Sequence, residues 1–461
     1  MNELTAAITE EENPLSEQRL NNALDGLEYY YYDHLKNRMS KSNALTIADY
    51  ILTMIVETNL TTNHKRGVVT SLKLLSQFLD NKPFKEMIKE DILAFLDSIR
   101  RPETKDPTHK WIGTYNQRLI NLQRFFKWLY SPDIEPSKRQ KPKVIENIPT
   151  LKRKEKSKYK ASDMWTKQEQ VIFLQYCGNK RDRCYHAMAI DTGCRPNELL
   201  KLRIKDIVFK TAENSTQYAE IQVNGKTGNR TIPLIVCIPY VKDWIDDHPQ
   251  RSNPHAYLFC GLKKNFGRAL TRSALYNTYM HYKEEAFPRL LQDTNVPTAD
   301  KEIIKDLLKK PWNPYIQRHN SMTEKAKILK ESLLRIHAGW TPNSKMPQTY
   351  LHYFGNESSE TLLEAAGIIT KDKKVDPLKP KQCPNCSEPN KPDSRFCANC
   401  RYILTYDAYD ETLQGQKEKE NRLFTLENQV KSLVSALGNM EGQHKNEFAK
   451  ALFVGGLFKK E

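Results

Sequence analysis

The sequence predicts a mainly α-helical protein with a small antiparallel β-sheet, that is, an α+β fold divided into several domains. Many stretches carry apolar residues at three- and four-residue spacing, and two alternating segments flank NGKTGN at 224–229. The first pattern places apolar side chains on one helix face, and the second is typical of a β-hairpin. The length of 461 residues favours two or three domains.

The first third of the chain divides by composition. Residues 1–44 are polar and acidic, and we expect them to form a segment outside the core. Residues 45–132 are expected to form a helical domain of four helices, the first of which Thr46 is suited to cap. Residues 133–162 predict a basic linker, because 131–160 hold ten Lys/Arg against four Asp/Glu. Such a linker is either a solvated hinge or a strap across DNA phosphates.

The remainder is expected to hold three further parts. Residues 163–368 mix helical patterns with the hairpin, residues 378–405 carry closely spaced cysteines, and residues 410–461 contain a helical stretch. That stretch has a short coiled-coil pattern, which suits either pairing of subunits or packing on its own domain. Its apolar positions are Leu423, Leu426, Val430, Leu433, Leu437 and Met440.

Charge and hydropathy narrow the class of function. The formal net charge of +16 favours a polyanionic partner, and nucleic acid is the commonest one. No apolar run reaches 18 residues, so we expect no membrane span. The N-terminal residues lack the basic and apolar regions of a signal peptide, which predicts a cytoplasmic protein.

Four of the nine cysteines form two C-x2-C pairs separated by ten residues. Two such pairs can supply four thiolates to a tetrahedral zinc ion, which predicts a structural zinc ribbon. Disulfide bonds are the alternative, which a reducing compartment disfavours. The expected ligands are Cys383, Cys386, Cys397 and Cys400.

Several polar and aromatic residues stand out in the mixed domain. Arg195 follows Gly193 and precedes Pro196, so it is expected at a junction between two helices, where an arginine can present its planar fork to a phosphate. Lys226 is expected at the hairpin tip. Each residue alone has an ordinary explanation as a surface or packing residue. The others occur downstream in the order Tyr315, Arg318, His319, Trp340 and Tyr350.

Taken together, these segments resemble the catalytic domain of the tyrosine recombinase and phage integrase family. TGCRPNELLKLRIKDI (192–207) resembles the box around the family's first catalytic arginine, and NGKTGNRTIPL (224–234) its lysine-bearing hairpin. YIQRHNS (315–321) is similar to the H-x-x-R-H box, and AGWTPNSKMPQTYLHY (338–353) to the His/Trp position and tyrosine box. The resemblance covers about 160–365 strongly, and it also covers about 45–130, where the family has a helical core-binding domain.

The resemblance implies DNA cleavage and rejoining through a covalent intermediate. Tyr350 would attack the scissile phosphate, leaving a 3′-phosphotyrosyl bond and a free 5′-hydroxyl. Arg195 and Arg318 would bind the nonbridging oxygens of the transition state. No catalytic metal is implied, because the arginines neutralise the charge. Double-stranded DNA and further copies of the chain, as a tetramer on two sites, are the implied partners.

The remaining roles follow from the same resemblance. Lys226 would protonate the leaving 5′-oxygen, Trp340 would donate its indole N–H to the phosphate, and Tyr315 would orient the phosphate. The implied catalytic residues are therefore Tyr350, Arg195, Arg318, Lys226, Tyr315 and Trp340.

One position departs from the family pattern. Tyr315 stands where the family usually has histidine, although some archaeal integrases are similar to this chain there. A phenol with a free pKa of about 10 is a poor base near neutral pH, so His319 is a possible substitute. Tyr353 is a rival nucleophile, but Tyr350 lies ten residues after Trp340, near the family spacing.

Two other functions remain open on the same fold. A type IB topoisomerase shares this set of residues but relaxes supercoils as a monomer. A catalytically silent DNA-binding regulator would keep the fold without the chemistry.

Overall fold

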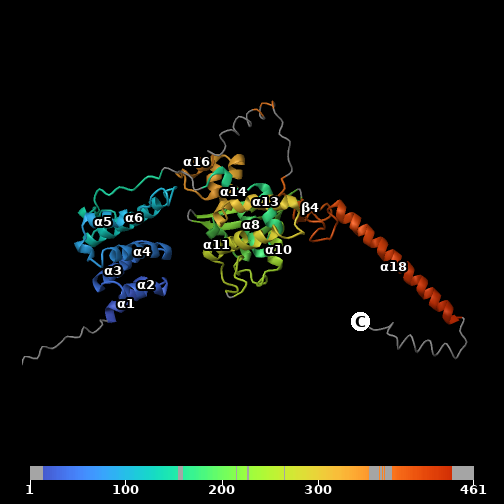
Figure 1. Ribbon diagram of the computed structural model, residues 1–461, viewed down its shortest axis with the longest axis horizontal. Coiled ribbons are helices and arrows are strands. Elements are labelled where there is room, and N and C mark those ends of the chain that lie inside the picture. The colour runs from blue at the N-terminus through green and yellow to red at the C-terminus, as the bar shows by residue number, and fades with distance from the viewer. Residues whose placement is uncertain are drawn as a thin grey trace, which may run out of the picture. The chain divides into compact units, whose positions relative to one another are not determined.

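The computed structural model describes residues 14–153, 159–213, 215–225, 228–263, 265–351 and 376–438, together with Leu363, Ala366 and Ile368. The chain divides into two units, Met1–Lys158 and Tyr159–Glu461. Both are mainly helical, and strands occur only in the second among the described residues (Figure 1). The predicted α+β class is confirmed.

The first unit is a helical domain with one apolar core. The four predicted helices are present as α3 to α6, and two further helices precede them. Ser40, rather than Thr46, caps α3, because its hydroxyl accepts a hydrogen bond from Asn43 N at 3.4 Å and the helix begins six residues earlier than Thr46 would allow. The helices are α1 (Pro14–Leu24), α2 (Tyr29–Asn37), α3 (Lys41–Glu57), α4 (Thr62–Phe78), α5 (Lys89–Asp97) and α6 (Trp111–Tyr130), with short 3-10 turns at Phe84–Glu86 and Lys143–Ile145.

The predicted polar segment 1–44 differs from the structure from residue 14 onward. Helices α1 and α2 contribute Leu20, Ala23, Leu24 and Leu35 to the core of the first unit. These residues repeat at helical spacing within an otherwise polar and acidic composition, so the average polarity of the segment conceals one apolar face. The helical domain therefore begins before residue 45.

The first part of the predicted linker also belongs to this unit. Val144, Ile145 and Ile148 are buried in its core, and Arg139 is buried while it pairs with Glu57. Residues 139–148 are therefore packed in the first unit, unlike the linker predicted at 133–162. Residues 154–158 lie outside the described part of the chain.

The second unit surrounds helix α8 (Lys180–Thr192), which packs against α14 (Pro314–Ile328) and α10 (Ile238–Asp246). Its sheet has the order β1–β2–β3 and is antiparallel, with β1 at Ile207–Thr211, β2 at Gln217–Gly225 and β3 at Gly228–Leu234. Alternate residues Ala219, Ile221 and Val223 of β2 enter the core, as the alternating pattern predicted.

The other helical elements of the second unit complete the catalytic part and one further module. They are α7 (Lys167–Tyr176), α9 (Pro196–Leu199), α11 (Arg272–His281), α12 (Phe287–Leu290), α13 (Thr298–Lys309), α15 (Glu331–Ala338), α16 (Met346–Leu351) and α18 (Tyr406–Gly438), with 3-10 turns at Ala161–Asp163 and Ile204–Asp206 and a π-helical turn at Tyr282–Ala286. None of the helices that the structure describes is long and apolar enough to cross a membrane.

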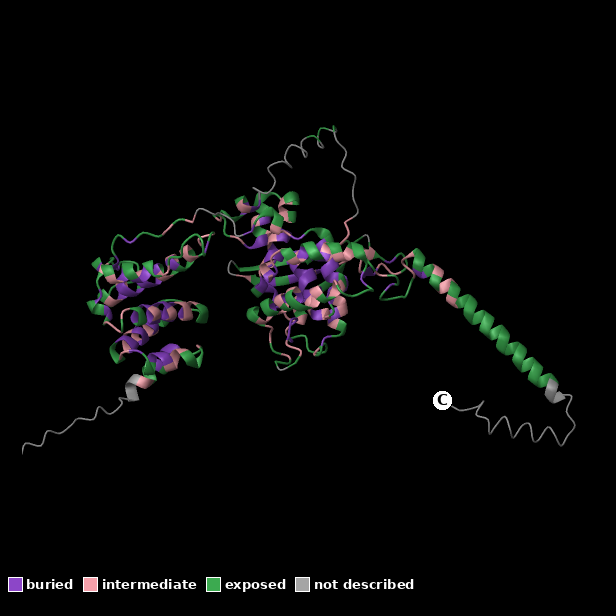
Figure 2. Cartoon of the chain, viewed as in Figure 1, coloured by how far each residue is buried: buried purple, intermediate pink, exposed green. Residues whose placement is uncertain are grey.

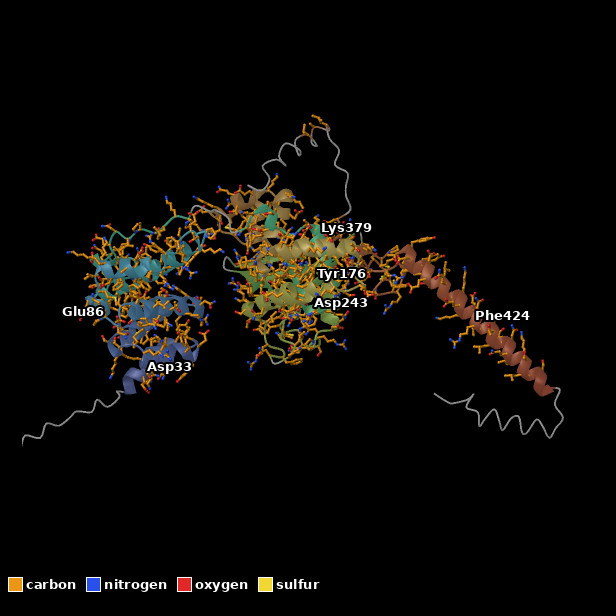
Figure 3. All side chains as sticks on the ribbon, in the orientation of Figure 1. Asp33, Glu86, Tyr176, Asp243, Lys379 and Phe424 are labelled. Carbon is orange, nitrogen blue, oxygen red and sulfur yellow. The ribbon has the colours of Figure 1, made fainter. Side chains whose placement is uncertain are left out.

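The cysteine segment folds as a two-stranded module that contacts α10. Strands β4 (Lys381–Gln382) and β5 (Pro389–Asn390) pair antiparallel. Lys242 Nζ of α10 lies 2.6 Å from Glu388 Oε1, and Asp243 of α10 pairs with Lys391. Asp243 is labelled in Figure 3. These ion pairs hold the cysteine module against the catalytic part.

Candidate active site

A tight connection between α8 and α9 positions Arg195. Gly193 ends α8 with φ of +63°, and Pro196 occupies the first turn of α9, as the sequence predicted. Arg195 is the N-cap, and its guanidinium donates to Glu198 Oε1 at 2.8 Å and to the Gly339 carbonyl at 2.9 Å. Its side chain is 27% exposed. The guanidinium is therefore fixed by hydrogen bonds on one side, while its other side faces a cavity.

Arg318 projects from α14 into the same region. Asn313 caps this helix by accepting from the backbone N–H of Tyr315 at 3.0 Å and of Ile316 at 3.2 Å. The Arg318 guanidinium donates to the carbonyls of Gly193 at 2.7 Å and Ala338 at 2.8 Å. Burial, with Arg195 as a second cause, lowers its pKa. A phosphate in the cavity would relieve this unfavourable burial of positive charge.

A buried carboxylate supports the first arginine. Glu198 is 4% exposed and accepts hydrogen bonds from Arg195 and from Arg230 of β3, whose Nη2 lies 2.7 Å from Oε2. Burial alone would raise the Glu198 pKa, but the hydrogen bonds from Arg230 and from the Arg195 backbone lower it to about 2. Sequence reasoning missed Arg230, because its partner is 32 residues away and only the strand register brings the two together.

Tyr350 and Trp340 stack on one another beside His319. The two rings have centroids 5.5 Å apart and planes 19° apart, and the Tyr350 hydroxyl lies 3.1 Å from His319 Nδ1. Tyr350 is 1% exposed and belongs to a small apolar cluster with Met322, Leu334 and Ala338. The guanidinium of Arg318 lies 5.9 Å from the centre of the Trp340 ring.

These side chains surround one cavity of about 410 Å³, which is open to solvent. Tyr315 lies at its edge and also borders a second cavity. Two anchored guanidinium groups, an indole and a phenol hydroxyl around one space suit the trigonal-bipyramidal transition state of phosphoryl transfer to tyrosine. The lining residues are Arg195, Tyr315, Arg318, His319, Gly339, Trp340, Thr341, Ser344, Met346 and Tyr350.

Lys226 and the rival nucleophile Tyr353 lie outside the described residues. The strands on either side of Lys226 are described, and Gly225 lies against Glu198. A Cβ atom added to Gly225 would come within 2.4 Å of Glu198 Oε1. Strand β2, which ends at Gly225, therefore passes directly beside the carboxylate that holds Arg195.

Two other residues near the cavity were not assigned from the sequence. Arg272, the first residue of α11, places its guanidinium 5.6 Å from the centre of the Tyr315 ring. His337 contacts the Thr192 carbonyl through Nε2 at 2.8 Å, and burial lowers its pKa to about 4. His337 is therefore neutral near pH 7, which suits a structural role at the end of α8.

The four predicted metal ligands lie together. The Sγ atoms of Cys383, Cys386, Cys397 and Cys400 all lie within 4.8 Å of one another, with two separations of 3.6 Å. A tetrahedral zinc ion with Zn–S bonds of about 2.3 Å requires sulfur separations of about 3.8 Å. The donor set fits such an ion, and the sulfur atoms are too far apart for disulfide bonds.

Several solved structures of DNA-bound enzymes are similar to the chain. The XerH site-specific recombinase bound to palindromic difH substrate has a TM-score of 0.46 and 17% identity, over 78% of this chain and 98% of that chain. A lambda integrase dimer bound to a COC′ core site has a TM-score of 0.47 and 14% identity, over 76% and 83%. The Tn1549 transposon integrase in complex with transposon right end DNA has a TM-score of 0.44 and 16% identity, over 70% and 99%.

The sequence comparison matches one segment of the chain to a known family. No curated protein sequence shows significant similarity to the chain. Residues 165–291 match the phage integrase family, and this segment contains Arg195 and Lys226. Arg318, Trp340 and Tyr350 follow the matched segment, and the structure brings them to the same cavity as Arg195. The match supports the resemblance over residues 165–291, where the chain is similar to the phage integrase family.

Proposed function

We propose that this protein is a site-specific DNA recombinase that cleaves and rejoins strands through a covalent bond to Tyr350. The observation that carries the proposal is the common cavity of Arg195, Arg318 and Tyr350, in which both arginines are anchored by backbone carbonyls. Anchored donors need little reorganisation when negative charge develops on the phosphate, which is the main source of electrostatic catalysis.

Each chemical step of the proposed reaction is carried out by a particular side chain. The Tyr350 oxygen attacks phosphorus and forms the 3′-phosphotyrosyl bond, while the bond to the 5′-oxygen breaks. Arg195 and Arg318 bind the nonbridging oxygens. Lys226 protonates the leaving 5′-oxygen, a role supported by the position of its neighbour Gly225 against Glu198. Rejoining reverses these steps, with the 5′-hydroxyl as the nucleophile.

The phenol proton has a nearby acceptor. His319 Nδ1 lies 3.1 Å from the Tyr350 hydroxyl, whereas Tyr315 stands where relatives usually carry a histidine. A histidine with an ordinary pKa of about 6.5 is a better base near neutral pH than a phenol. We therefore assign the base role to His319, and orientation of the phosphate to Tyr315 and to the indole of Trp340.

Tyr350 borders the same cavity as the two arginines, although its side chain is 1% exposed and stacked on Trp340.

Assembly and metal binding complete the proposal. We infer that four copies act on two DNA sites and that helix α18 contributes to their contacts. Leu423, Leu426, Val430 and Leu433 of α18 are exposed, which argues against packing of this seam on its own domain (Figure 2). The cysteine module binds a structural zinc ion, and DNA as substrate favours a cytoplasmic protein.

Two other functions use the same fold. A type IB topoisomerase would form the same tyrosyl bond without joining two DNA partners, and the exposed seam of α18 favours recombination over that monomeric activity. A silent DNA-binding regulator has no need for two anchored arginines aimed at one cavity with a tyrosine. We therefore rank both functions below recombination.

The test is a suicide substrate, a nicked DNA that carries the protein's binding site and traps the covalent intermediate. Wild type, Tyr350→Phe and the matched variant Tyr353→Phe are incubated with it in chelator. We expect a DNA-linked protein species with wild type and Tyr353→Phe, and none with Tyr350→Phe. Tight site binding by wild type without any adduct would reject the enzyme in favour of the regulator, and an adduct without joining of two DNA partners would favour the topoisomerase.

A further inference from the structure

A second cavity of about 380 Å³ adjoins the reaction cavity. The two share Arg195 and Tyr315 as a common wall. Arg318, Trp340 and Tyr350 border only the first, whereas Lys201, Asn224, Gly225 and Arg272 border only the second. The second cavity therefore has its own cations and adds binding capacity that the cleavage chemistry does not use.

The cations of the second cavity are available to a ligand. Arg272 and Lys201 are exposed, and among the described residues no carboxylate forms an ion pair with either. The one carboxylate in the cavity wall, Glu198, already binds Arg195 and Arg230. Arg272 is held by the Tyr315 ring at 5.6 Å, a cation–π contact that leaves its N–H donors free to bind. This combination selects an anion.

We propose that Arg272 binds the DNA phosphate adjacent to the scissile phosphate, on the side of the leaving 5′-oxygen. The proposal rests on the function proposed above. Successive phosphates of one strand fit two cavities with a common wall. The side follows from Gly225, because it borders the second cavity and precedes Lys226, the proposed proton donor to the 5′-oxygen. The nucleotide released by cleavage thus lies on this side.

This role explains how the site can work with a tyrosine at position 315. Its phenol brings no positive charge to the DNA backbone, whereas the guanidinium above its ring does. Binding the flanking phosphate would also keep the free 5′-hydroxyl close to the phosphotyrosine after cleavage, so that rejoining stays faster than loss of the strand. Arg272 is accordingly a substrate-binding residue, distinct from the two arginines that bind the scissile phosphate.

The test combines variants of Arg272 with DNA in which one phosphate is replaced by an uncharged methylphosphonate. Positions are the scissile phosphate and its neighbour on each side. Wild type, Arg272→Ala and Arg272→Lys are compared with Arg289→Ala, which removes an arginine from α12 whose side chain is 75% exposed and pairs with Glu285. Affinity for the binding site and the rate of adduct formation are both measured, after thermal unfolding has verified that each variant is folded.

We expect the leaving-side methylphosphonate to weaken binding by wild type and Arg289→Ala roughly tenfold, as for other hydrogen bonds between charged groups. Arg272→Ala should bind unmodified DNA roughly tenfold more weakly and lose nothing further at that position, because one contact cannot be removed twice. Arg272→Lys should keep part of the affinity, since it retains the charge but not the fork.

Coupling of Arg272 to the scissile phosphate or to the upstream neighbour would overturn the assignment, and so would equal losses in wild type and Arg272→Ala at every position. Because affinity needs no chemistry, the assignment is decided even if wild type binds its site and forms no adduct, a result that would reject the proposed function alone. Failure of wild type to bind any DNA site would overturn both.

Discussion

The hydroxyl of Tyr350 lies 3.1 Å from Nδ1 of His319, although 31 residues separate the two in the sequence. The contact connects the proposed nucleophile to a group able to take its proton. It also joins α14, which carries Arg318, to α16, which carries Tyr350. The proposed phosphate-binding Arg318 and the proposed nucleophile are therefore positioned through adjacent residues of one helix.

Replacing His319 tests its role as base. His319→Asn keeps a polar atom near the position of Nδ1 but cannot accept the proton, so adduct formation at pH 7 should slow by roughly 10²-fold or more. Single-turnover rates on the suicide substrate between pH 5 and 9 provide the measurement. The wild type should react faster than the variant, because only the wild type has an imidazole nitrogen beside the Tyr350 hydroxyl. A variant with wild-type rates at every pH would return the base role to Tyr315 or to water.

The Glu198 carboxylate predicts a pH-dependent contribution to stability. Hydrogen bonds from Arg230 and Arg195 outweigh burial and lower its pKa to about 2, below its usual 4.5. Its contribution is therefore fully present above about pH 4.5 and is lost as pH falls toward 2. A change of this size corresponds to about 3 kcal/mol.

The measurement is the free energy of unfolding in urea for wild type and Glu198→Gln at pH 7, 5 and 3. The wild type should be more stable by about 3 kcal/mol at pH 7 and pH 5, and the difference should shrink at pH 3. A difference that stays constant across this range would mean that shape, rather than charge, makes Glu198 important.

The sequence predicted the parts of the site that local patterns encode. Gly193 and Pro196 define the junction that presents Arg195, because both residues have strong backbone preferences. Arg230 and Arg272 were missed for the opposite reason. Each looks like an ordinary surface residue, and its role arises only when β3 reaches Glu198 or α11 reaches Tyr315.

Some helices and strands of the fold could likewise be predicted from local patterns, whereas others could not. Strong apolar periodicity located α4 and α6, and alternation located the hairpin. Helices α1 and α2 were missed because their few apolar residues lie in a polar, acidic context, and only packing against α3 shows that one face is buried. Average composition over a segment therefore underestimates a narrow apolar face.

Gly193→Ala should destabilise the protein and displace Arg318, because Gly193 packs closely on α14. The glycine has φ of +63°, and a Cβ atom there would lie 2.1 Å from Met322 Cε and 2.8 Å from Ser321 Oγ. Strain and overpacking together should cost about 2–4 kcal/mol. Because the Gly193 carbonyl accepts from Arg318, adduct formation should also fall.

The matched control for this variant is Gly67→Ala within α4, where an added Cβ meets nothing within 4 Å. This control should leave stability unchanged or raise it by up to about 1 kcal/mol. Thermal unfolding and the suicide substrate are applied to both. Equal behaviour of the two variants would contradict the close packing of Gly193 on α14.

Removing the proposed zinc ion should unfold the cysteine module without stopping DNA cleavage. Native mass spectrometry should find one zinc ion in wild type and in Ser394→Ala, and none in the double variant Cys383→Ser, Cys397→Ser. Because the four thiolates close the coordination sphere, chelator should make residues 378–405 sensitive to protease without stopping adduct formation. Loss of the adduct in chelator, restored by added metal, would instead require a metal in the reaction.

The exposed seam of α18 predicts that assembly depends on this helix. Leu426 and Val430 are exposed, as is Phe424, whose side chain stands away from the helix in Figure 3. Charged residues at two seam positions repel one another across a helix–helix contact, so Leu426→Glu with Val430→Glu should reduce tetramers on two-site DNA. Asn428→Glu, on the opposite face, is the matched control. Sedimentation of the protein–DNA complexes gives the stoichiometry.

The seam spans fewer than three heptads, so we expect the loss of tetramers to be largest at low protein concentration. Tetramers that persist in the double variant at every concentration would exclude α18 from the contact.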